Sequence, residues 1–92
     1  MNDEIDVHLG RRLRRRRRLL GLTQQQLAGA CGVRFQQIQK YECAANRLSA
    51  ARLWELAIAL GVQPNYFFDG MLPQEERRSF SPYPSAELRS AP

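Results

Sequence analysis

Hydrophobic residues recur at helical spacing over most of the chain, beginning near its N-terminus. Between about Asp6 and Leu20, apolar Leu9, Leu13 and Leu20 lie four and seven residues apart, and arginines fill most of the positions between them. This narrow apolar stripe is typical of an amphipathic helix. Gly21 follows directly and is expected to end that helix.

The next two helices are predicted from their ends as much as from their apolar residues. Thr23 is an expected N-cap with a glutamine three residues later, which completes a capping box, and Gly32 stops the helix. Residues 35–43 repeat the pattern, with Ile38 and Tyr41 facing inward. The sequence therefore predicts two short helices joined by a tight turn.

A fourth helix gives the strongest periodic signal, between the expected N-cap Ser49 and Gly61. Its inward face consists of Leu53, Leu56, Ala57 and Leu60. Trp54 and Ile58 are rotated away from this face; we interpret them as the edge of the core, with a partner surface as the alternative. Pro64 then suits the start of a short fifth helix over PNYFFDG.

The composition changes after residue 70, and this divides the chain. Residues 71–92 hold four of the five prolines with little apolar periodicity, so we expect a disordered, flexible C-terminal tail. Residues 7–70 form one all-α domain of five helices, and residues 1–6 form an acidic N-terminal extension. No apolar run approaches the roughly 18 residues of a membrane span, and the start of the chain lacks a signal-peptide pattern. A cytoplasmic location without membrane contact is expected.

The net charge of +5 is unevenly distributed. Residues 1–6 carry −3 and residues 73–92 are neutral, so the segment between them carries +8. Seven of these positive charges are arginines between positions 11 and 18. Such a field favours a polyanionic partner, with nucleic acid ahead of an acidic membrane surface.

Few side chains in the sequence suit catalysis or metal binding. Cys31 and Cys43 form no CxxC motif and His8 is the only histidine, so neither a metal site nor a disulfide framework is indicated. No nucleophile has a matched base, and no Gly-rich phosphate loop is present. We therefore expect no enzymatic activity and no cofactor.

The two short helices can instead be interpreted as a motif that contacts the bases of a nucleic acid. Helices that cross steeply need a small residue at their contact and a left-handed corner, which Ala28 and Gly32 provide. The residues left facing outward near the start of the third helix are Arg34, Phe35, Gln36, Gln37 and Lys40. A glutamine can pair with adenine, a lysine can reach guanine, and a phenylalanine can press on a thymine methyl. The plainer interpretation is a solvated helix face.

Three stretches in one register resemble a known family: LGRRLRRRRRLLGLTQQQLA, GVRFQQIQKYE and LSAARLWELAIALGV. From about Leu9 to Gly70 the chain is similar to the phage repressor and Cro-like helix-turn-helix proteins, the XRE family. The resemblance implies a lambda-repressor-like domain whose third helix reads an operator in the major groove of double-stranded DNA. It further implies a bacterial or phage-encoded, nucleoid-associated transcription regulator, most often a repressor, that binds as a homodimer.

The resemblance also implies roles for individual residues. The base-reading positions are Arg34, Phe35, Gln36, Gln37 and Lys40. The phosphate-contacting positions are Gln24, Arg11, Asn46 and Arg47. Arg17 and Glu42 match a structural ion pair between the first and third helices. The dimer candidates are Pro64, Tyr66 and Phe68.

Two positions depart from the family pattern, and one alternative function remains open. Ala44 lies where a glycine with a left-handed backbone is usual, and Arg34 lies where serine or threonine usually caps the third helix. The alternative to an operator-binding regulator is an antitoxin or adaptor module whose main partner is another protein, either a toxin or RNA polymerase. The operator sequence, the sign of regulation and any effector are not predicted.

Overall fold

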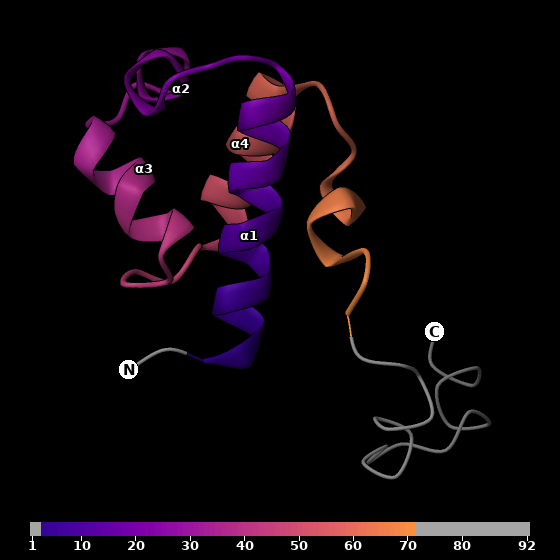
Figure 1. The fold of residues 1–92 in the computed structure, drawn as a ribbon. Coiled ribbons are helices and arrows are strands. Elements are labelled where there is room, and N and C mark those ends of the chain that lie inside the picture. The colour runs from indigo at the N-terminus through magenta and orange to yellow at the C-terminus, as the bar shows by residue number, and fades with distance from the viewer. Residues whose placement is uncertain (1–2, 72–92) are drawn as a thin grey trace, which may run out of the picture.

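The computed structural model describes residues 3–71, and in this range the chain forms four α-helices followed by one 3-10 helix (Figure 1). The elements are α1 (Glu4–Leu19), α2 (Gln24–Cys31), α3 (Phe35–Glu42), α4 (Ala50–Leu60) and η1 (Pro64–Phe68). The all-helical prediction is confirmed for these residues. Except for Met71, the predicted tail over residues 71–92 lies outside the described residues.

The predicted fifth α-helix is wrong in type, because η1 is a 3-10 helix of five residues. The N–H of Tyr66 donates to the Gln63 carbonyl, and the N–H of Asp69 donates to the Tyr66 carbonyl. Both bonds span three residues, as in a 3-10 helix. A segment of five residues is too short to gain much from α-type hydrogen bonding.

The first helix begins earlier than the sequence pattern indicated. Asp3 caps α1 by accepting the Ile5 N–H at 2.9 Å, and the acidic Glu4 and Asp6 lie in its first turn, where they favour the helix dipole. The division at residue 6 is therefore corrected: residues 4–6, predicted to be an extension, belong to α1.

The turn between α2 and α3 forms as the sequence predicted. Thr23 Oγ1 accepts the Gln26 N–H at 3.0 Å while Gln26 Oε1 accepts the Thr23 N–H at 2.8 Å, which completes the capping box. Gly32 adopts the left-handed backbone at φ 69°, and the Val33 N–H closes the turn on the Ala28 carbonyl. The capping box fixes where α2 begins, and the Gly32 turn ends α2 and so sets where α3 can begin.

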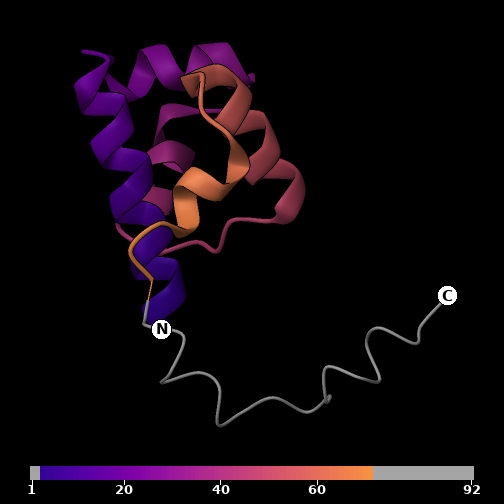
Figure 2. The ribbon, with the colours of Figure 1, turned by 90° about the vertical axis from the view of Figure 1, so that its right-hand side faces the viewer.

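Every element contributes to one core. The largest fully buried side chains are Phe67, Leu13, Leu27, Ile38, Leu56 and Leu60. In Figure 1, α1 lies in front of α4, with the α2–α3 pair on one side and η1 on the other. Figure 2 shows α1 at the left edge of the domain and η1 between α1 and α4. The α2–α3 pair lies to one side of α1 (Figure 1). On α3, Phe35, Gln36, Gln39 and Lys40 are exposed to solvent.

Gly10 sets how closely α1 approaches α3. A Cβ atom added there would lie 2.5 Å from the Tyr41 carbonyl oxygen and 2.8 Å from that of Glu42, both of them backbone atoms. Only glycine fits this crossing. The close approach brings Arg17, two turns further along α1, beside Glu42 at the end of α3.

Trp54 and Ile58 do not lie at the core edge, so that interpretation is wrong. Their side chains are 58% and 66% exposed. The core-facing stripe of α4 is fully occupied by its leucines and Ala57, and within residues 3–71 no further element covers the opposite side. Among the described residues, no helix combines the length and the apolar character that a bilayer crossing requires.

Candidate nucleic-acid interface

A shallow depression of about 350 Å³ lies on the open side of α3. Its lining residues are Arg34, Gln36, Gln37, Lys40 and Asn46. The structure thus brings together four of the five predicted base-reading residues and one predicted phosphate contact. The fifth, Phe35, lies outside this lining at the first residue of α3 and is 36% exposed.

The chemistry of this depression suits a nucleic acid. Three of its side chains are amides, two are cations, and none is a carboxylate. Amides present a donor and an acceptor to base edges, whereas cations bind phosphates or the acceptor atoms of guanine. A shallow polar hollow of this kind has no enclosed apolar chamber for a small-molecule substrate.

Arg34 leaves the start of α3 without a side-chain cap. Its backbone is extended at φ −78° and ψ 148°, as in an N-cap, but its side chain makes no capping hydrogen bond. The exposed cationic residue therefore stands at a helix end whose uncapped N–H groups carry the positive end of the helix dipole. Both features favour an anion or a base acceptor at this end of α3.

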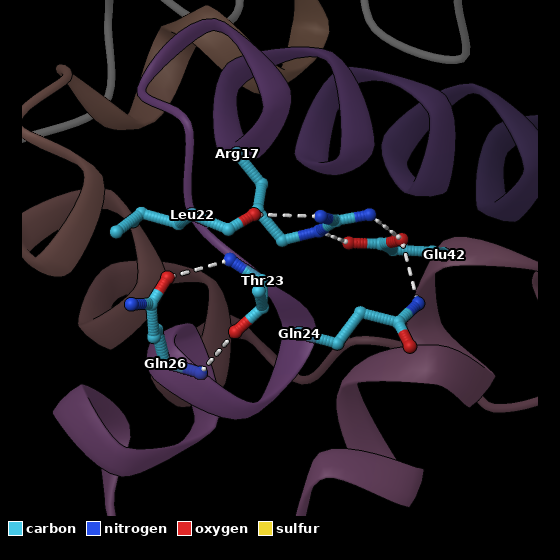
Figure 3. Close-up of polar contacts among 6 residues, drawn as sticks. All are labelled: Arg17, Leu22, Thr23, Gln24, Gln26 and Glu42. Carbon is cyan, nitrogen blue, oxygen red and sulfur yellow. Dashed lines mark hydrogen bonds and ion pairs between the residues drawn. The ribbon is translucent and has the colours of Figure 1, made fainter.

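A buried ion pair ties α1 to the end of α3 (Figure 3). Arg17 donates from Nε to Glu42 Oε2 at 2.6 Å, from Nη2 to Glu42 Oε1 at 3.0 Å, and from Nη1 to the Leu22 carbonyl at 2.8 Å. The side chains of Arg17 and Glu42 are only 10% and 4% exposed. Hydrogen bonding to Glu42 raises the pKa of Arg17, against the opposing effect of burial.

Gln24 joins the same cluster instead of lying free at the surface. Its Nε2 donates to Glu42 Oε1 at 3.0 Å, so three hydrogen bonds converge on one carboxylate (Figure 3). The carboxylate links α1, the start of α2 and the end of α3. The second N–H of the Gln24 amide is the donor that remains for a phosphate.

The arginine run divides between structural and exposed side chains. Arg12 donates to the Tyr66 carbonyl at 2.9 Å and lies 3.8 Å over the Tyr66 ring, and Arg16 donates to the Leu60 carbonyl at 3.0 Å. Arg12 therefore holds η1 against α1 and Arg16 holds the end of α4 against it, whereas Arg17 holds α3. The exposed members, which form no ion pair within residues 3–71, are Arg11, Arg14, Arg15 and Arg18.

Arg47 is paired with the N-terminal turn of α1, which the sequence did not indicate. Its Nε lies 3.1 Å from Asp6 Oδ2 and its Nη2 lies 3.6 Å from Asp3 Oδ2, while its side chain stays 70% exposed. Asn46, its neighbour, lines the depression. The α3–α4 loop therefore presents Asn46 at the site and anchors Arg47 to α1.

The dimer candidates differ in what they expose. Tyr66 packs edge-on against Phe67, with ring centroids 5.8 Å apart, and it also lies under Arg12. Pro64 is half-buried, and Phe68 is 47% exposed. Of the three, Phe68 presents the most apolar surface.

The two cysteines are both free thiols, and they differ in burial. Cys31 packs against the core, and burial raises the pKa of its thiol while nearby Arg52 partly opposes this. Cys43 is exposed, and its Sγ lies 3.7 Å from the Lys40 carbonyl. Within the described part of the chain, no group of three or more His, Cys, Asp or Glu residues could hold a metal ion.

Comparison with known proteins gives relatives of one kind. The helix-turn-helix family model matches residues 13–67. An uncharacterised HTH-type transcriptional regulator, y4aM of Sinorhizobium fredii, is 49% identical over 67 residues, which cover 73% of this chain and 47% of that protein. An uncharacterised transcriptional regulator in the ATPase CF(0) region of Rhodospirillum rubrum is 52% identical over 67 residues, covering 73% and 62%. The chain spans about half the length of the curated relatives it matches.

Solved structures show the same fold. The restriction-modification controller protein C.AhdI from Aeromonas hydrophila superposes with a TM-score of 0.67 at 32% identity, covering 68% of this chain and 96% of that one. The clp gene regulator ClgR from C. glutamicum superposes with a TM-score of 0.70 at 25% identity, covering 79% and 100%. Both similarities extend over most of the domain described above.

Proposed function

The chain belongs to the XRE family of helix-turn-helix transcriptional regulators, and on this premise we propose that it reads a specific operator through α3 in the major groove of DNA. The observation that supports this most is the composition of the depression on α3. Its amides and cations project from one exposed helix face and from the loop that follows. Helix-turn-helix proteins present this face to base edges.

The proposal divides the side chains by what they contact. Gln36 and Gln37 pair with adenine, Arg34 and Lys40 reach guanine, and Phe35 contacts a thymine methyl. The phosphate contacts that set the register of the complex are Gln24, Arg11, Asn46 and Arg47. Arg47 keeps its exposed face for a phosphate while Asp6 holds its Nε.

We call the side of α3 that carries Arg34, Gln36, Gln37 and Lys40 the reading face. The ion pair between Arg17 and Glu42 makes this face rigid. It joins α1 to α3, and Gln24 attaches the start of α2 to the same carboxylate. A recognition helix that is fixed before binding loses less conformational entropy on DNA. We assign both charged residues to structure and not to DNA contact.

We further propose that the protein acts as a homodimeric repressor, with Pro64, Tyr66 and Phe68 at the dimer contact. Twofold symmetry would place two copies of α3 about 34 Å apart, which demands an inverted repeat in the operator. Repression would follow from occupying DNA that polymerase needs. This activity belongs in the bacterial cytoplasm, at the nucleoid.

One observation favours a second function, an antitoxin or adaptor that binds a toxin or RNA polymerase. Trp54 and Ile58 expose a large apolar area on the outer side of α4. Exposed apolar side chains on neighbouring helix turns suit a protein partner. Trp54→Ala with Ile58→Ala would then abolish binding to that partner and leave the DNA footprint unchanged.

Footprinting on fragmented host DNA, at two salt concentrations, tests the operator proposal. The Gln36→Ala, Lys40→Ala variant should lose a discrete symmetric footprint while keeping weak, salt-sensitive binding. Gln39→Ala is the matched control, because Gln39 is exposed on α3 but does not line the depression. Diffuse protection by the parent protein, unchanged in the double variant, would refute operator reading.

A further inference from the structure

Tyr41 lies directly beneath one of the proposed base-reading side chains. Gln37 and Tyr41 are four residues apart on α3, and the Gln37 Nε2 donates to the Tyr41 hydroxyl oxygen at 2.6 Å. Tyr41 is only 5% exposed and belongs to the core, whereas Gln37 lines the depression. Tyr41 therefore reaches the reading face only through Gln37.

We propose that Tyr41 is a positioning residue that orients the Gln37 amide toward a base and so sets a preference for adenine at one position of each half-site. The inference rests on the proposed function, because it requires that α3 reads base edges. It assigns a specificity role to a side chain that itself does not touch DNA.

The chemistry of the amide determines which base is preferred. A carboxamide has two N–H bonds and one carbonyl oxygen. Since one N–H is donated to Tyr41, the carbonyl oxygen and the other N–H remain free. Adenine requires this acceptor for N6–H and this donor for N7, while guanine presents two acceptors at the same edge. A Gln37 amide held by Tyr41 thus discriminates between the two purines.

Tyr41 also influences a residue of α4. Its side chain is the main cause that raises the pKa of Arg52, and Arg52 itself donates to Glu55 Oε1 at 2.7 Å.

Gln36 provides an internal comparison. It lines the same depression and is exposed, but its side chain forms no hydrogen bond to any residue within the described range 3–71. Its amide must be ordered by DNA itself, whereas the Gln37 amide is ordered beforehand. Ordering before binding lowers the entropic cost of each contact.

The test uses the full chain and duplexes selected from randomised DNA. Dissociation constants are measured for the selected site and for sites substituted at each position, with the parent, Gln37→Ala, Tyr41→Phe and the control Gln39→Ala, which lies outside the depression. A bidentate amide–adenine pair discriminates by about 5- to 150-fold. Tyr41→Phe should lower the preference for adenine at the Gln37 position by at least about threefold, with unchanged affinity for nonspecific DNA.

Each outcome decides a different claim. If the parent selects a motif but Tyr41→Phe keeps the parent's full preference, the positioning role is refuted and operator reading survives. If Gln37→Ala leaves every preference intact, Gln37 is not a reader and the inference fails. If the parent protein selects no DNA motif, both the proposed operator reading and this inference fail. In the Gln37→Ala background, Tyr41→Phe should cause no further loss of base preference. This result separates a positioning role from a general structural effect of the substitution.

A measurement on the unmodified protein covers the case in which Tyr41→Phe does not fold. Nitrogen-15 relaxation of the side-chain amides, in the absence of DNA, should show Gln37 nearly as ordered as the backbone and Gln36 clearly more mobile. Equal mobility of the two amides would overturn the inference.

Discussion

Removing Glu42 should destabilise the domain strongly, because its partner Arg17 is buried and would lose its counter-charge. The Glu42 carboxylate accepts two hydrogen bonds from Arg17 and one from Gln24. In Glu42→Ala, the guanidinium would stay buried with the Leu22 carbonyl as its remaining acceptor. An unpaired buried charge of this kind costs about 3–5 kcal/mol.

That loss is large relative to the stability of a small domain. A domain of about 70 residues has a total unfolding free energy of about 4–10 kcal/mol. A change of 1 kcal/mol shifts the Tm of such a domain by about 4–8 °C, so Glu42→Ala should lower the Tm by more than about 12 °C. The reading face should loosen at the same time, because α3 loses its attachment to α1 and α2.

Urea denaturation and thermal melts followed by circular dichroism measure this effect. Glu55→Ala is the matched control, since its ion pair with Arg52 is 52% exposed at the carboxylate and should contribute less than about 1 kcal/mol. Replacing both Arg17 and Glu42 by methionine should recover most of the loss, because no charge is then left unpaired. A loss below about 1 kcal/mol in Glu42→Ala would refute the reasoning.

Three further perturbations follow from backbone fit and from exposed charge. Gly10→Ala should destabilise the domain by about 1–3 kcal/mol, because its Cβ would overlap backbone oxygens of α3; chemical denaturation measures this. Ala44→Gly should change stability by less than about 1 kcal/mol, whereas Ala44→Val should destabilise clearly, because a β-branched side chain does not tolerate the observed φ of 63°. Replacing Arg14, Arg15 and Arg18 by glutamine should reduce the salt slope of DNA binding by up to about 2.7 without changing base preference.

The controls for these variants come from the same chain. Gly29 is a helical glycine with no atom within 4 Å of an added Cβ, so Gly29→Ala should be neutral or stabilising. If Gly10→Ala behaves like Gly29→Ala, the α1–α3 crossing is looser than described. A salt slope that is unchanged without the three arginines would show that they do not contact phosphate. Equal stability of the two Ala44 variants would contradict the strain argument.

Much of the helical framework could be predicted because its signals are local. Periodic leucines, the Thr23 capping box and the left-handed Gly32 each act within a few residues, so their outcome is visible in the sequence. The pairing of Gln37 with Tyr41 was also visible in principle, since four residues separate them on one helix.

The features that escaped prediction depend on distant segments. The Asp6–Arg47 pair joins positions 41 residues apart, and the need for glycine at position 10 arises only from the α1–α3 crossing. Exposure of Trp54 depends on the absence of a covering element in the described residues, which no pattern in α4 itself encodes. Such features depend on tertiary contacts and cannot be predicted from local sequence patterns.

The most direct test of the central claim is chemical-shift mapping of the labelled full chain on its footprinted operator. If α3 reads the operator, the largest chemical-shift perturbations should fall on residues 34–40 and on Asn46. This pattern of perturbations should disappear when the operator bases are scrambled. Perturbations confined to α4 around Trp54 and Ile58, or identical on operator and scrambled DNA, would contradict the account.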